Sequence, residues 1–150
     1  MGAERERAQR RQCRRCLRSE VYEITLEGVF SAAHAISVRG VREPLHGHDW
    51  RVTVTVTGPG LDSDGLLCDF HALEEVLRGV IDPLKDRNLL DAELLRGMNP
   101  TAENVAKRIA EEVDLRARPM LGPIGARVAR VRVTEAVGCS AAYEPGAGQV

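Results

Sequence analysis

Residues 30–50 read FSAAHAISVRGVREPLHGHDW, and this stretch contains three of the four histidines of the chain, His34, His46 and His48. If His46 and His48 lie on a strand, its two-residue period directs both imidazoles to the same face. A partner strand that ends at His34 would place a third imidazole beside them. Three neutral imidazoles with one open position form the ligand set of a catalytic zinc. The alternative is a polar loop with surface histidines, because H-x-H alone is a common pattern.

Alternation of apolar and polar residues predicts strands on both sides of this stretch. Segment 21–29 places Tyr22, Ile24 and Leu26 on one face, and segment 49–57 alternates valine with arginine and threonine. The Gly-Pro-Gly run at 58–60 ends the second strand. Because about a dozen residues, from His34 to His46, join the two strands, we expect them to pair as antiparallel strands.

Two further strands are predicted near the end of the chain, at 127–134 and 139–144. In the first of them, Val131 and Val133 share a face with Glu135, which follows at the same period. A carboxylate that ends an apolar strand face is costly to bury unless it meets a partner. Glu135 is therefore a candidate binding residue.

Two amphipathic helices are predicted between these strand pairs. The first follows Asp69, a good N-cap residue, and Pro83 either ends or kinks it. The second begins around 99–101 with a proline in its first turn, and we expect Pro119 to lie in the loop that follows it. The apolar residues of both helices recur at a helical period. They are Phe70, Leu73, Val76, Leu77, Val80 and Ile81 in the first helix, and Ala102, Val105, Ala106, Ile109 and Val113 in the second.

The order of two strands, two helices and two strands predicts an α+β domain, a four-stranded antiparallel sheet with both helices on one face. A length of 150 residues suits one domain. The net charge of −1 gives no general reason to expect nucleic-acid or membrane partners. No apolar run approaches the roughly 18 residues of a membrane span. Four scattered cysteines indicate a reduced, cytoplasmic protein.

Residues 1–18 differ in composition from the rest, with seven arginines, two glutamates and almost nothing to bury. We interpret them as a disordered basic arm ahead of a domain at 19–150. The pair Cys13 and Cys16 has the spacing of a zinc or redox motif, but no second ligand pair follows at zinc-finger spacing. Two thiols in a flexible tail are the favoured interpretation.

Several motifs together resemble one known family. They are FSAAH at 30–34, LHGH at 45–48, DF at 69–70, RNLLD at 87–91, NPTAENVA at 99–106 and VRVTEA at 131–136. With them the chain resembles the 6-pyruvoyltetrahydropterin synthase and 6-carboxytetrahydropterin synthase family from about residue 21 to 144. The resemblance implies the tunnelling fold, in which subunits assemble their sheets into a barrel, commonly as a hexamer of two trimers. It also implies zinc bound by His34, His46 and His48.

The resemblance further implies a pterin substrate, 7,8-dihydroneopterin triphosphate. Glu135 would accept two hydrogen bonds from the amino and ring N–H groups of the pterin, without being a zinc ligand. Thr101 and Glu103 match positions near the pterin end of the site. For Glu103, a favourable acid at a helix N-terminus is an equally good explanation.

Two departures from the family pattern bear on the reaction. Family members that make the pyruvoyl or carboxy product have a cysteine at the position of Arg42. The segment around Glu43 instead resembles the type III branch, which has glutamate and cleaves the side chain to give 6-hydroxymethyl-7,8-dihydropterin. The usual catalytic histidine falls on Asp86, which is either a carboxylate acid/base or a plain helix-end residue. For Glu43 the alternative is a solvated loop carboxylate.

The sequence therefore predicts a zinc-dependent lyase in which Glu43 and Asp86 are the catalytic candidates. A 6-carboxytetrahydropterin synthase is the alternative reaction, disfavoured by the missing cysteine. A protein that binds zinc and pterin without catalysis is the alternative of another class.

Overall fold

The computed structural model describes residues 21–146. The predicted basic arm and its pair Cys13 and Cys16 lie outside the described residues. In chain order the strands and helices are β1 (Tyr22–His34), β2 (Ser37–Val38), β3 (Val41–Arg42), β4 (His46–Gly58), α2 (Phe70–Ile81), β5 (Arg87–Asn88), α3 (Ala102–Leu121), β6 (Arg127–Ala136) and β7 (Cys139–Tyr143). Short 3-10 turns lie at Asp82–Leu84, Glu93–Leu95 and Gly122–Ile124.

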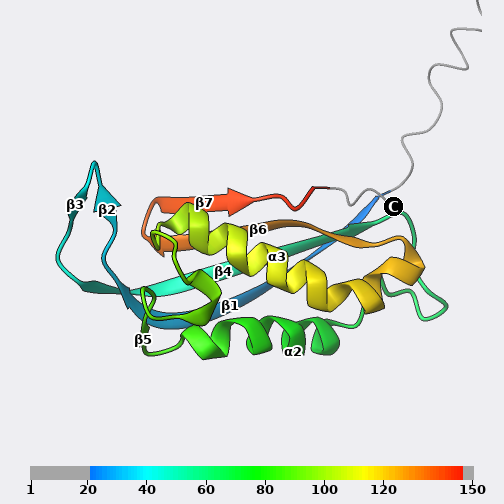
Figure 1. Ribbon diagram of the computed structural model, residues 1–150. Helices are drawn as coiled ribbons and strands as arrows, with labels where there is room; N and C mark the ends of the chain where they lie inside the picture. The colour runs from blue at the N-terminus through cyan, green and yellow to red at the C-terminus, as the bar shows by residue number, and fades with distance from the viewer. Residues whose placement is uncertain (1–20, 147–150) are drawn as a thin grey trace, which may run out of the picture.

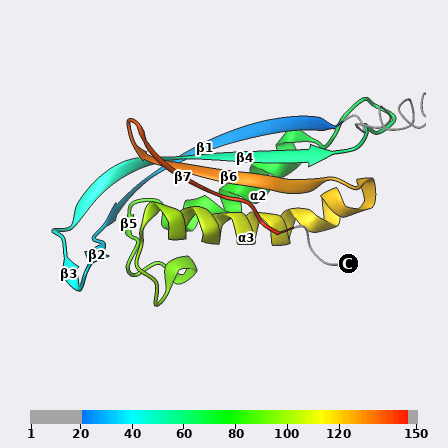
Figure 2. The same ribbon diagram turned by 90° about the horizontal axis from the view of Figure 1, so that it is seen from above.

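The structure has two layers, a sheet in the order β5-β1-β4-β6-β7 and a layer of two helices. Figures 1 and 2 show α2 and α3 side by side on one face of the sheet. The predicted α+β class and its four antiparallel strands are confirmed. The structure adds β5, which pairs in parallel with β1 over two residues, and a small β2–β3 hairpin that projects beyond the end of the sheet. Strands of two residues are too short to show a period in the sequence.

The two longest strands, β1 and β4, are paired along their whole length of 13 residues each. Both exceed the predicted segments and run into the histidine-containing stretch. His34 lies opposite His46, and Ala32 lies opposite His48. Because side chains on a strand alternate, the three histidines share the face that carries the buried Trp50 and Val52. This is the face that the helices cover.

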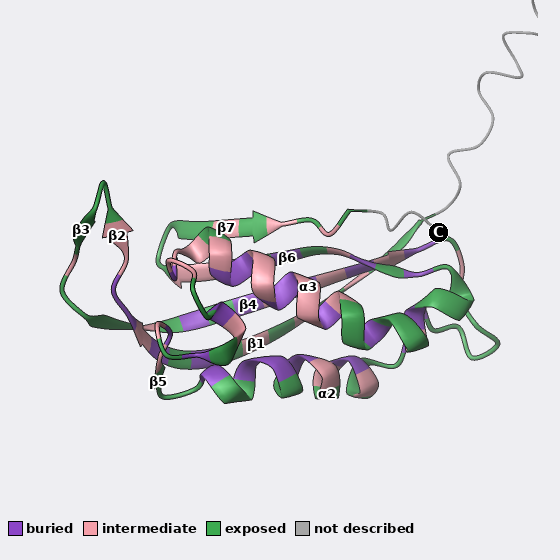
Figure 3. Cartoon of the chain, viewed as in Figure 1, coloured by how far each residue is buried: buried purple, intermediate pink, exposed green. Residues whose placement is uncertain are grey.

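Both helices start at side-chain caps, and their apolar stripes meet the sheet. The Asp69 carboxylate accepts a hydrogen bond from the His71 backbone N–H at 2.8 Å, as the predicted N-cap requires. Thr101 caps α3 in the same way. The core lies between the two layers, where Figure 3 shows the buried parts of the helices and strands. Its main contributors are Leu73, Leu77, Val80 and Ile81 of α2 and Val105, Ala106, Ile109, Ala110, Val113, Ala117 and Leu121 of α3.

The prediction that Pro119 lies in a loop is wrong. Pro119 is inside α3, in its last turn, and the helix continues to Leu121. A proline removes one backbone donor, and near a helix end that loss affects a single hydrogen bond. The burial of Ala117 and Leu121 holds this turn against the sheet in spite of it. None of the helices within residues 21–146 is long and apolar enough to cross a membrane.

The close contact at Gly58 yields a stability prediction. A Cβ at Gly58 would lie 2.6 Å from Leu67 Cδ1 and 3.2 Å from the Ala126 Cα, so backbone would have to move. We expect Gly58→Ala to lower the free energy of unfolding by about 1–3 kcal/mol through overpacking. Gly60→Ala is the matched control, because nothing lies within 4 Å of its Cβ position. Urea denaturation of both variants measures the difference, and equal stability would contradict the packing argument.

Candidate functional site

The three predicted histidines meet Glu135 at one end of the sheet. One ligand atom from each of His34, His46, His48 and Glu135 lies within 4.8 Å of all the others. His34 ends β1, His46 and His48 begin β4, and Glu135 lies near the end of β6. The ring of His34 is 4.7 Å from that of His46 and 5.2 Å from that of His48, between centroids. The structure therefore brings together residues about one hundred positions apart in the chain.

Backbone carbonyls orient two of the imidazoles. His34 Nδ1 lies 2.8 Å from the Pro100 carbonyl oxygen, and His46 Nδ1 lies 2.9 Å from that of Pro44. A carbonyl oxygen only accepts, so Nδ1 carries the proton in both rings. In a neutral imidazole the other nitrogen, Nε2, then has a free lone pair. This arrangement of an oriented ring with Nε2 free is typical of metal-binding histidines.

Two of the Nε2 atoms are buried without a hydrogen bond. His34 Nε2 and His48 Nε2 are both enclosed, and neither has a hydrogen-bond partner in the described part of the chain. Glu135 Oε1 lies 3.0 Å from the first and 3.2 Å from the second, a close contact that lacks hydrogen-bond alignment. A buried polar atom without a partner costs about 1–3 kcal/mol. A divalent cation that takes both lone pairs removes this cost, so the donor set fits a metal ion.

Trp50 forms the inner wall of this cluster. Its ring is fully buried and makes edge contacts with His34 at 4.9 Å and His48 at 5.8 Å, between centroids. Its Nε1–H donates a hydrogen bond to the Ala32 carbonyl oxygen at 3.2 Å. The indole therefore fixes the strand pair and keeps water from the inner side of the imidazoles.

Glu135 reaches the histidines from a bulge in β6. The register between β6 and β7 shifts between Thr134 and Ala136, so Glu135 is the extra residue. A bulge redirects a side chain out of the regular ladder. The side chain of Glu135 is 24% exposed, so it is partly open to solvent where it meets the buried His34 ring. The strand pattern predicted a binding role for Glu135, but it did not predict contact with the histidines.

Glu43 lies beside the ring of His46. Its Oε1 accepts a hydrogen bond from the Ile36 backbone N–H at 3.0 Å and lies 3.8 Å from His46 Nδ1. The backbone N–H of Glu43 also donates to the Ile36 carbonyl at 3.0 Å. These bonds close the base of the β2–β3 hairpin and hold the carboxylate at the edge of the cluster, on the opposite side of the ring from Nε2.

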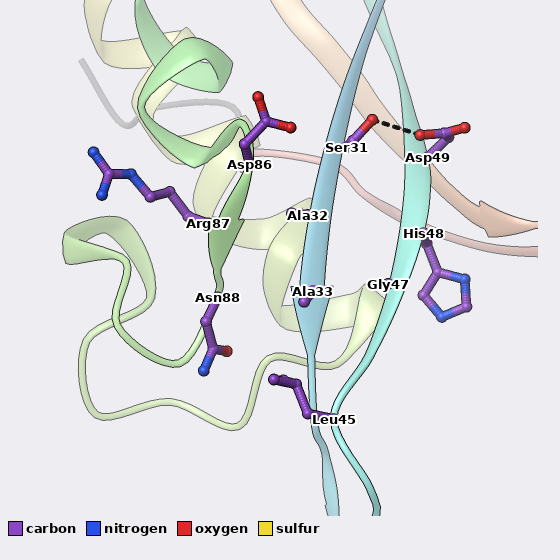
Figure 4. A pocket seen from close by; sticks show the side chains of 10 residues that line it. All are labelled: Ser31, Ala32, Ala33, Leu45, Gly47, His48, Asp49, Asp86, Arg87 and Asn88. Atoms are coloured by element: carbon purple, nitrogen blue, oxygen red, sulfur yellow. Dashed lines mark hydrogen bonds between the residues drawn. The ribbon is translucent and has the colours of Figure 1, made fainter.

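Asp86 lines a pocket of about 590 Å³ that His48 also lines. Figure 4 shows the two on opposite sides of β1 and β4, with the His48 ring pointing away from Asp86. Ala32 pairs with His48 on one side and with Arg87 on the other, so β5 lies about 10 Å from β4. Asp86 has a left-handed backbone with φ of 56°, and its N–H donates to the Ser31 carbonyl at 2.7 Å. The structure therefore places Asp86 in the pocket but not at the histidines.

The segment before α3 supplies the remaining predicted residues and one that sequence reasoning missed. Thr101 Oγ1 accepts from the Asn104 backbone N–H at 3.3 Å as the N-cap, and Glu103 is exposed in the first turn. The missed residue is Asn99. Its amide accepts from the Ser37 N–H at 2.8 Å and donates to the Ser37 carbonyl at 2.9 Å. Asn99 thus fastens the β2–β3 hairpin to the loop whose Pro100 carbonyl orients His34.

No thiol joins the histidine cluster in residues 21–146. Cys68 is in the core, where burial and then the neighbouring Asp69 charge raise the pKa of its thiol. Cys139 is exposed at the start of β7. The absence of cysteine at position 42 is therefore not compensated by another cysteine of the described residues.

Fold and site together define an α+β protein with a histidine-rich candidate metal centre at one end of an antiparallel sheet. The family model described as 6-pyruvoyl tetrahydropterin synthase matches residues 23–146. The chain belongs to this family, as the sequence motifs predicted.

Named relatives agree with this assignment. The chain is 38% identical over 87 residues to the dihydroneopterin monophosphate aldolase of Pyrococcus furiosus, covering 56% of this chain and 68% of the relative. It is 33% identical over 106 residues to a putative 6-carboxy-5,6,7,8-tetrahydropterin synthase of Archaeoglobus fulgidus, covering 71% of this chain and 81% of the relative. The structure of Caenorhabditis elegans 6-pyruvoyl tetrahydropterin synthase superposes with a TM-score of 0.71 at 21% identity, covering 87% of this chain and 100% of that one. This last likeness establishes the fold.

The double hydrogen bond of Asn99 yields a second prediction. Asn99→Ala leaves the Ser37 N–H and carbonyl without their partner, and we expect the free energy of unfolding to fall by about 1–3 kcal/mol. Ser37→Ala is the matched control, because both bonds involve only the Ser37 backbone. Urea denaturation of the two variants is the measurement. If Asn99→Ala is no less stable than Ser37→Ala, the two hydrogen bonds between Asn99 and the Ser37 backbone do not contribute to the stability of the fold.

Proposed function

We propose that this protein is a zinc-dependent pterin lyase that cleaves the side chain of a phosphorylated 7,8-dihydroneopterin to give 6-hydroxymethyl-7,8-dihydropterin. The observation that carries the proposal is the convergence of His34, His46 and His48, two of whose Nε2 atoms are buried without a hydrogen bond. Family membership supports a pterin as the substrate, and the aldolase relative supports a carbon–carbon cleavage.

Zinc is the cation that suits the donor set of neutral imidazoles in a site that substrate can reach. Bound there by the three histidines, zinc would supply Lewis-acid polarisation of oxygen atoms on the pterin side chain. The protein's own contribution is to orient the rings through the Pro100 and Pro44 carbonyls and to exclude water with Trp50.

Glu43 is the proposed acid/base. In the cleavage, the hydroxyl on the second side-chain carbon loses its proton to a carboxylate and becomes an aldehyde as the bond to the first carbon breaks. The electron pair left on the first carbon then takes up a proton, which gives the hydroxymethyl group. One Glu43 oxygen is held by the Ile36 N–H, and the other makes no hydrogen bond within the described part of the chain. A fixed carboxylate with one free oxygen at the edge of the cluster suits both proton transfers.

Asp86, Glu135, Thr101 and Glu103 are the proposed residues around the rest of the substrate. Glu135 is proposed to accept from the N–H groups of the pterin, and Thr101 and Glu103 lie at the α3 N-terminus next to the Pro100 carbonyl. Asp86 is proposed as the second acid/base, acting from the pocket that His48 also lines. The left-handed backbone of Asp86 supports its alternative role as a turn residue.

The second candidate function is that of a 6-carboxytetrahydropterin synthase, which the similarity to the Archaeoglobus fulgidus protein favours. Arg42 in place of the expected cysteine argues against it, and so does the lack of a thiol in the cluster among residues 21–146. The third candidate, a zinc- and pterin-binding protein without catalysis, is separated from the first two by the experiment on Glu43 below.

We also propose assembly into a homo-hexamer of two trimers. Within the described residues, β1 pairs on its outer side only at Ala32 and Ala33, and β7 is the opposite edge of the same sheet. These two edges have unpaired backbone groups, so β1 of one copy can pair with β7 of the next and extend the sheet. Analytical ultracentrifugation of the full chain tests this, and a monomer would contradict it.

For the metal we expect about one zinc per chain in the purified protein. His46→Ala should remove most of it, because a ligand with an oriented Nε2 is lost. His71→Ala is the control, since His71 is exposed on α2 outside the cluster and should leave the zinc content unchanged. Metal analysis by mass spectrometry is the measurement. Full zinc content in the variant that replaces His34, His46 and His48 together would overturn the site.

For the reaction we expect Glu43→Gln to slow single-turnover cleavage about 10²–10⁴-fold while zinc content persists. Glutamine keeps an oxygen for the Ile36 N–H but cannot transfer the proton. The assay follows conversion of 7,8-dihydroneopterin monophosphate and triphosphate, with the products identified by chromatography. Glu75→Gln, an exposed change on α2, should keep the wild-type rate.

Three other outcomes of this assay decide between the candidates. A Glu43→Gln variant as fast as the wild type removes Glu43 from the mechanism. A carboxy product from the wild type establishes the second candidate. A wild-type protein that binds zinc and pterin but converts neither substrate establishes the third.

A further inference from the structure

Asn99 holds the β2–β3 hairpin by two hydrogen bonds to a single residue. Its Oδ1 accepts from the Ser37 N–H at 2.8 Å, and its Nδ2–H donates to the Ser37 carbonyl at 2.9 Å. A neighbouring strand would bind Ser37 in the same way, since hydrogen-bonded residues of an antiparallel pair exchange both bonds. Within residues 21–146, no other hydrogen bond joins residues 36–43 to a part of the chain outside the hairpin.

The hairpin has little else to fix its conformation. β2 and β3 pair over two residues and form a sheet of their own. Figure 2 shows them projecting beyond the end of the main sheet. Val38 and Val41 are 56% and 73% exposed, so their packing contributes little. Because a two-stranded hairpin alone is at best marginally stable in water, its base, at residues 36, 37 and 43, has to hold it in place.

One rigid peptide unit connects Asn99 with Glu43. The Ile36 carbonyl and the Ser37 N–H belong to the same trans peptide bond, which is planar. Asn99 binds the N–H end of this unit, and the carbonyl end accepts from the Glu43 N–H at 3.0 Å. The Ile36 N–H in turn donates to Glu43 Oε1 at 3.0 Å. A shift of Ser37 is therefore transmitted to both the backbone and the carboxylate of Glu43.

We propose that Asn99 is a positioning residue that holds the Glu43 carboxylate at the edge of the histidine cluster. The next residue, Pro100, directs its carbonyl to His34 Nδ1 at 2.8 Å. Two neighbouring residues of one loop thus orient a histidine directly and the carboxylate through the hairpin. The inference rests on the proposed function, in which Glu43 is the acid/base.

Removal of the Asn99 side chain should leave the histidine side of this arrangement intact. The backbone carbonyl of Asn99 accepts from the Thr101 N–H at 2.8 Å and from Asn104 Nδ2 at 2.9 Å. Alanine keeps this carbonyl, so the loop keeps its anchor to α3. The Pro100 carbonyl then stays at His34, and the defect in Asn99→Ala is confined to the hairpin.

The first arm of the test measures single-turnover cleavage of 7,8-dihydroneopterin monophosphate and triphosphate. We expect Asn99→Ala to lower the rate at saturating substrate about 10–100-fold, because a misplaced carboxylate transfers protons poorly. Zinc content and KM should stay at the wild-type values, since the histidines are not disturbed.

Two variants control for side-chain loss and for reduced stability. Ser37→Ala keeps both backbone groups that Asn99 binds. Gly58→Ala disturbs the packing at the opposite end of the β1–β4 pair, beside Leu67 and Ala126. Both should cleave at the wild-type rate, so a loss of stability alone does not reproduce the effect of Asn99→Ala.

A double variant separates positioning from general damage. If Asn99 acts through Glu43, adding Asn99→Ala to Glu43→Gln should lower the remaining rate less than about threefold, because proton transfer by the carboxylate is already lost. Effects that are independent would instead multiply.

The second arm does not depend on catalysis. Hydrogen–deuterium exchange, resolved to residues by mass spectrometry, reports on the N–H groups of Ile36, Ser37 and Glu43. We expect all three to exchange at least about 10-fold faster in Asn99→Ala, because the base of the hairpin opens locally. Gly58→Ala should leave their exchange as in the wild type. Asn99→Asp keeps the acceptor for the Ser37 N–H, so its losses in both arms should be smaller, and it replaces Asn99→Ala if that variant does not fold.

The outcomes separate this inference from the proposed function. An Asn99→Ala variant that cleaves as fast as Ser37→Ala overturns the inference, and so does a loss that Gly58→Ala shares or that multiplies with Glu43→Gln. Faster exchange at Ser37 alone, with Ile36 and Glu43 unchanged, also overturns it. A wild-type protein that cleaves neither substrate overturns the proposed reaction, and the exchange measurement then decides by itself whether Asn99 holds Glu43.

Discussion

The antiparallel register of β1 and β4 is the constraint on which the rest of the site depends. Pairing continues from Tyr22 opposite Gly58 to His34 opposite His46 without a break. Because side chains alternate, a slip of one residue would turn His46 and His48 to the face opposite His34. The same slip would expose Val52, Val54 and Val56, which are fully buried. The core therefore fixes the register, and the register positions the imidazoles.

Helix α3 positions the groups that orient the histidines of this strand pair. Its apolar stripe packs on β6 and β7, and the loop before its N-terminus reaches the end of β1. There the Pro100 carbonyl reaches the ring of His34, which is almost completely buried. Asn99 ties the same loop to Ser37, so the hairpin that carries Glu43 is held by the helix side of the molecule. The packing of α3 on the sheet thus positions the Pro100 carbonyl, and this carbonyl sets the tautomer of His34.

The sequence predicted what depends on a period, a cap or a motif. The long strands, both helices, Asp69 as a cap and the meeting of the three histidines follow from residue type and spacing. What it could not predict depends on the path of the backbone. Every residue has a backbone carbonyl, so the sequence does not reveal that those of Pro100 and Pro44 orient the histidines. The two-residue strands are too short to show a period. Strand parity put Glu135 on the correct face, but the contact of its oxygen with two imidazoles depends on the register of β6 against β4, which residue type does not reveal.

The two carboxylates at the cluster differ in how firmly they are held, and this difference separates their chemistry. Glu43 is held by the Ile36 N–H and faces the outer edge of His46, so its position does not depend on a metal. The carboxylate of Glu135 makes no hydrogen bond within the described residues and faces two buried Nε2 atoms. A group that must exchange partners benefits from weak attachment, whereas an acid/base benefits from a fixed position. The anchored carboxylate suits proton transfer, and the unanchored one is free to turn and accept hydrogen bonds from a substrate.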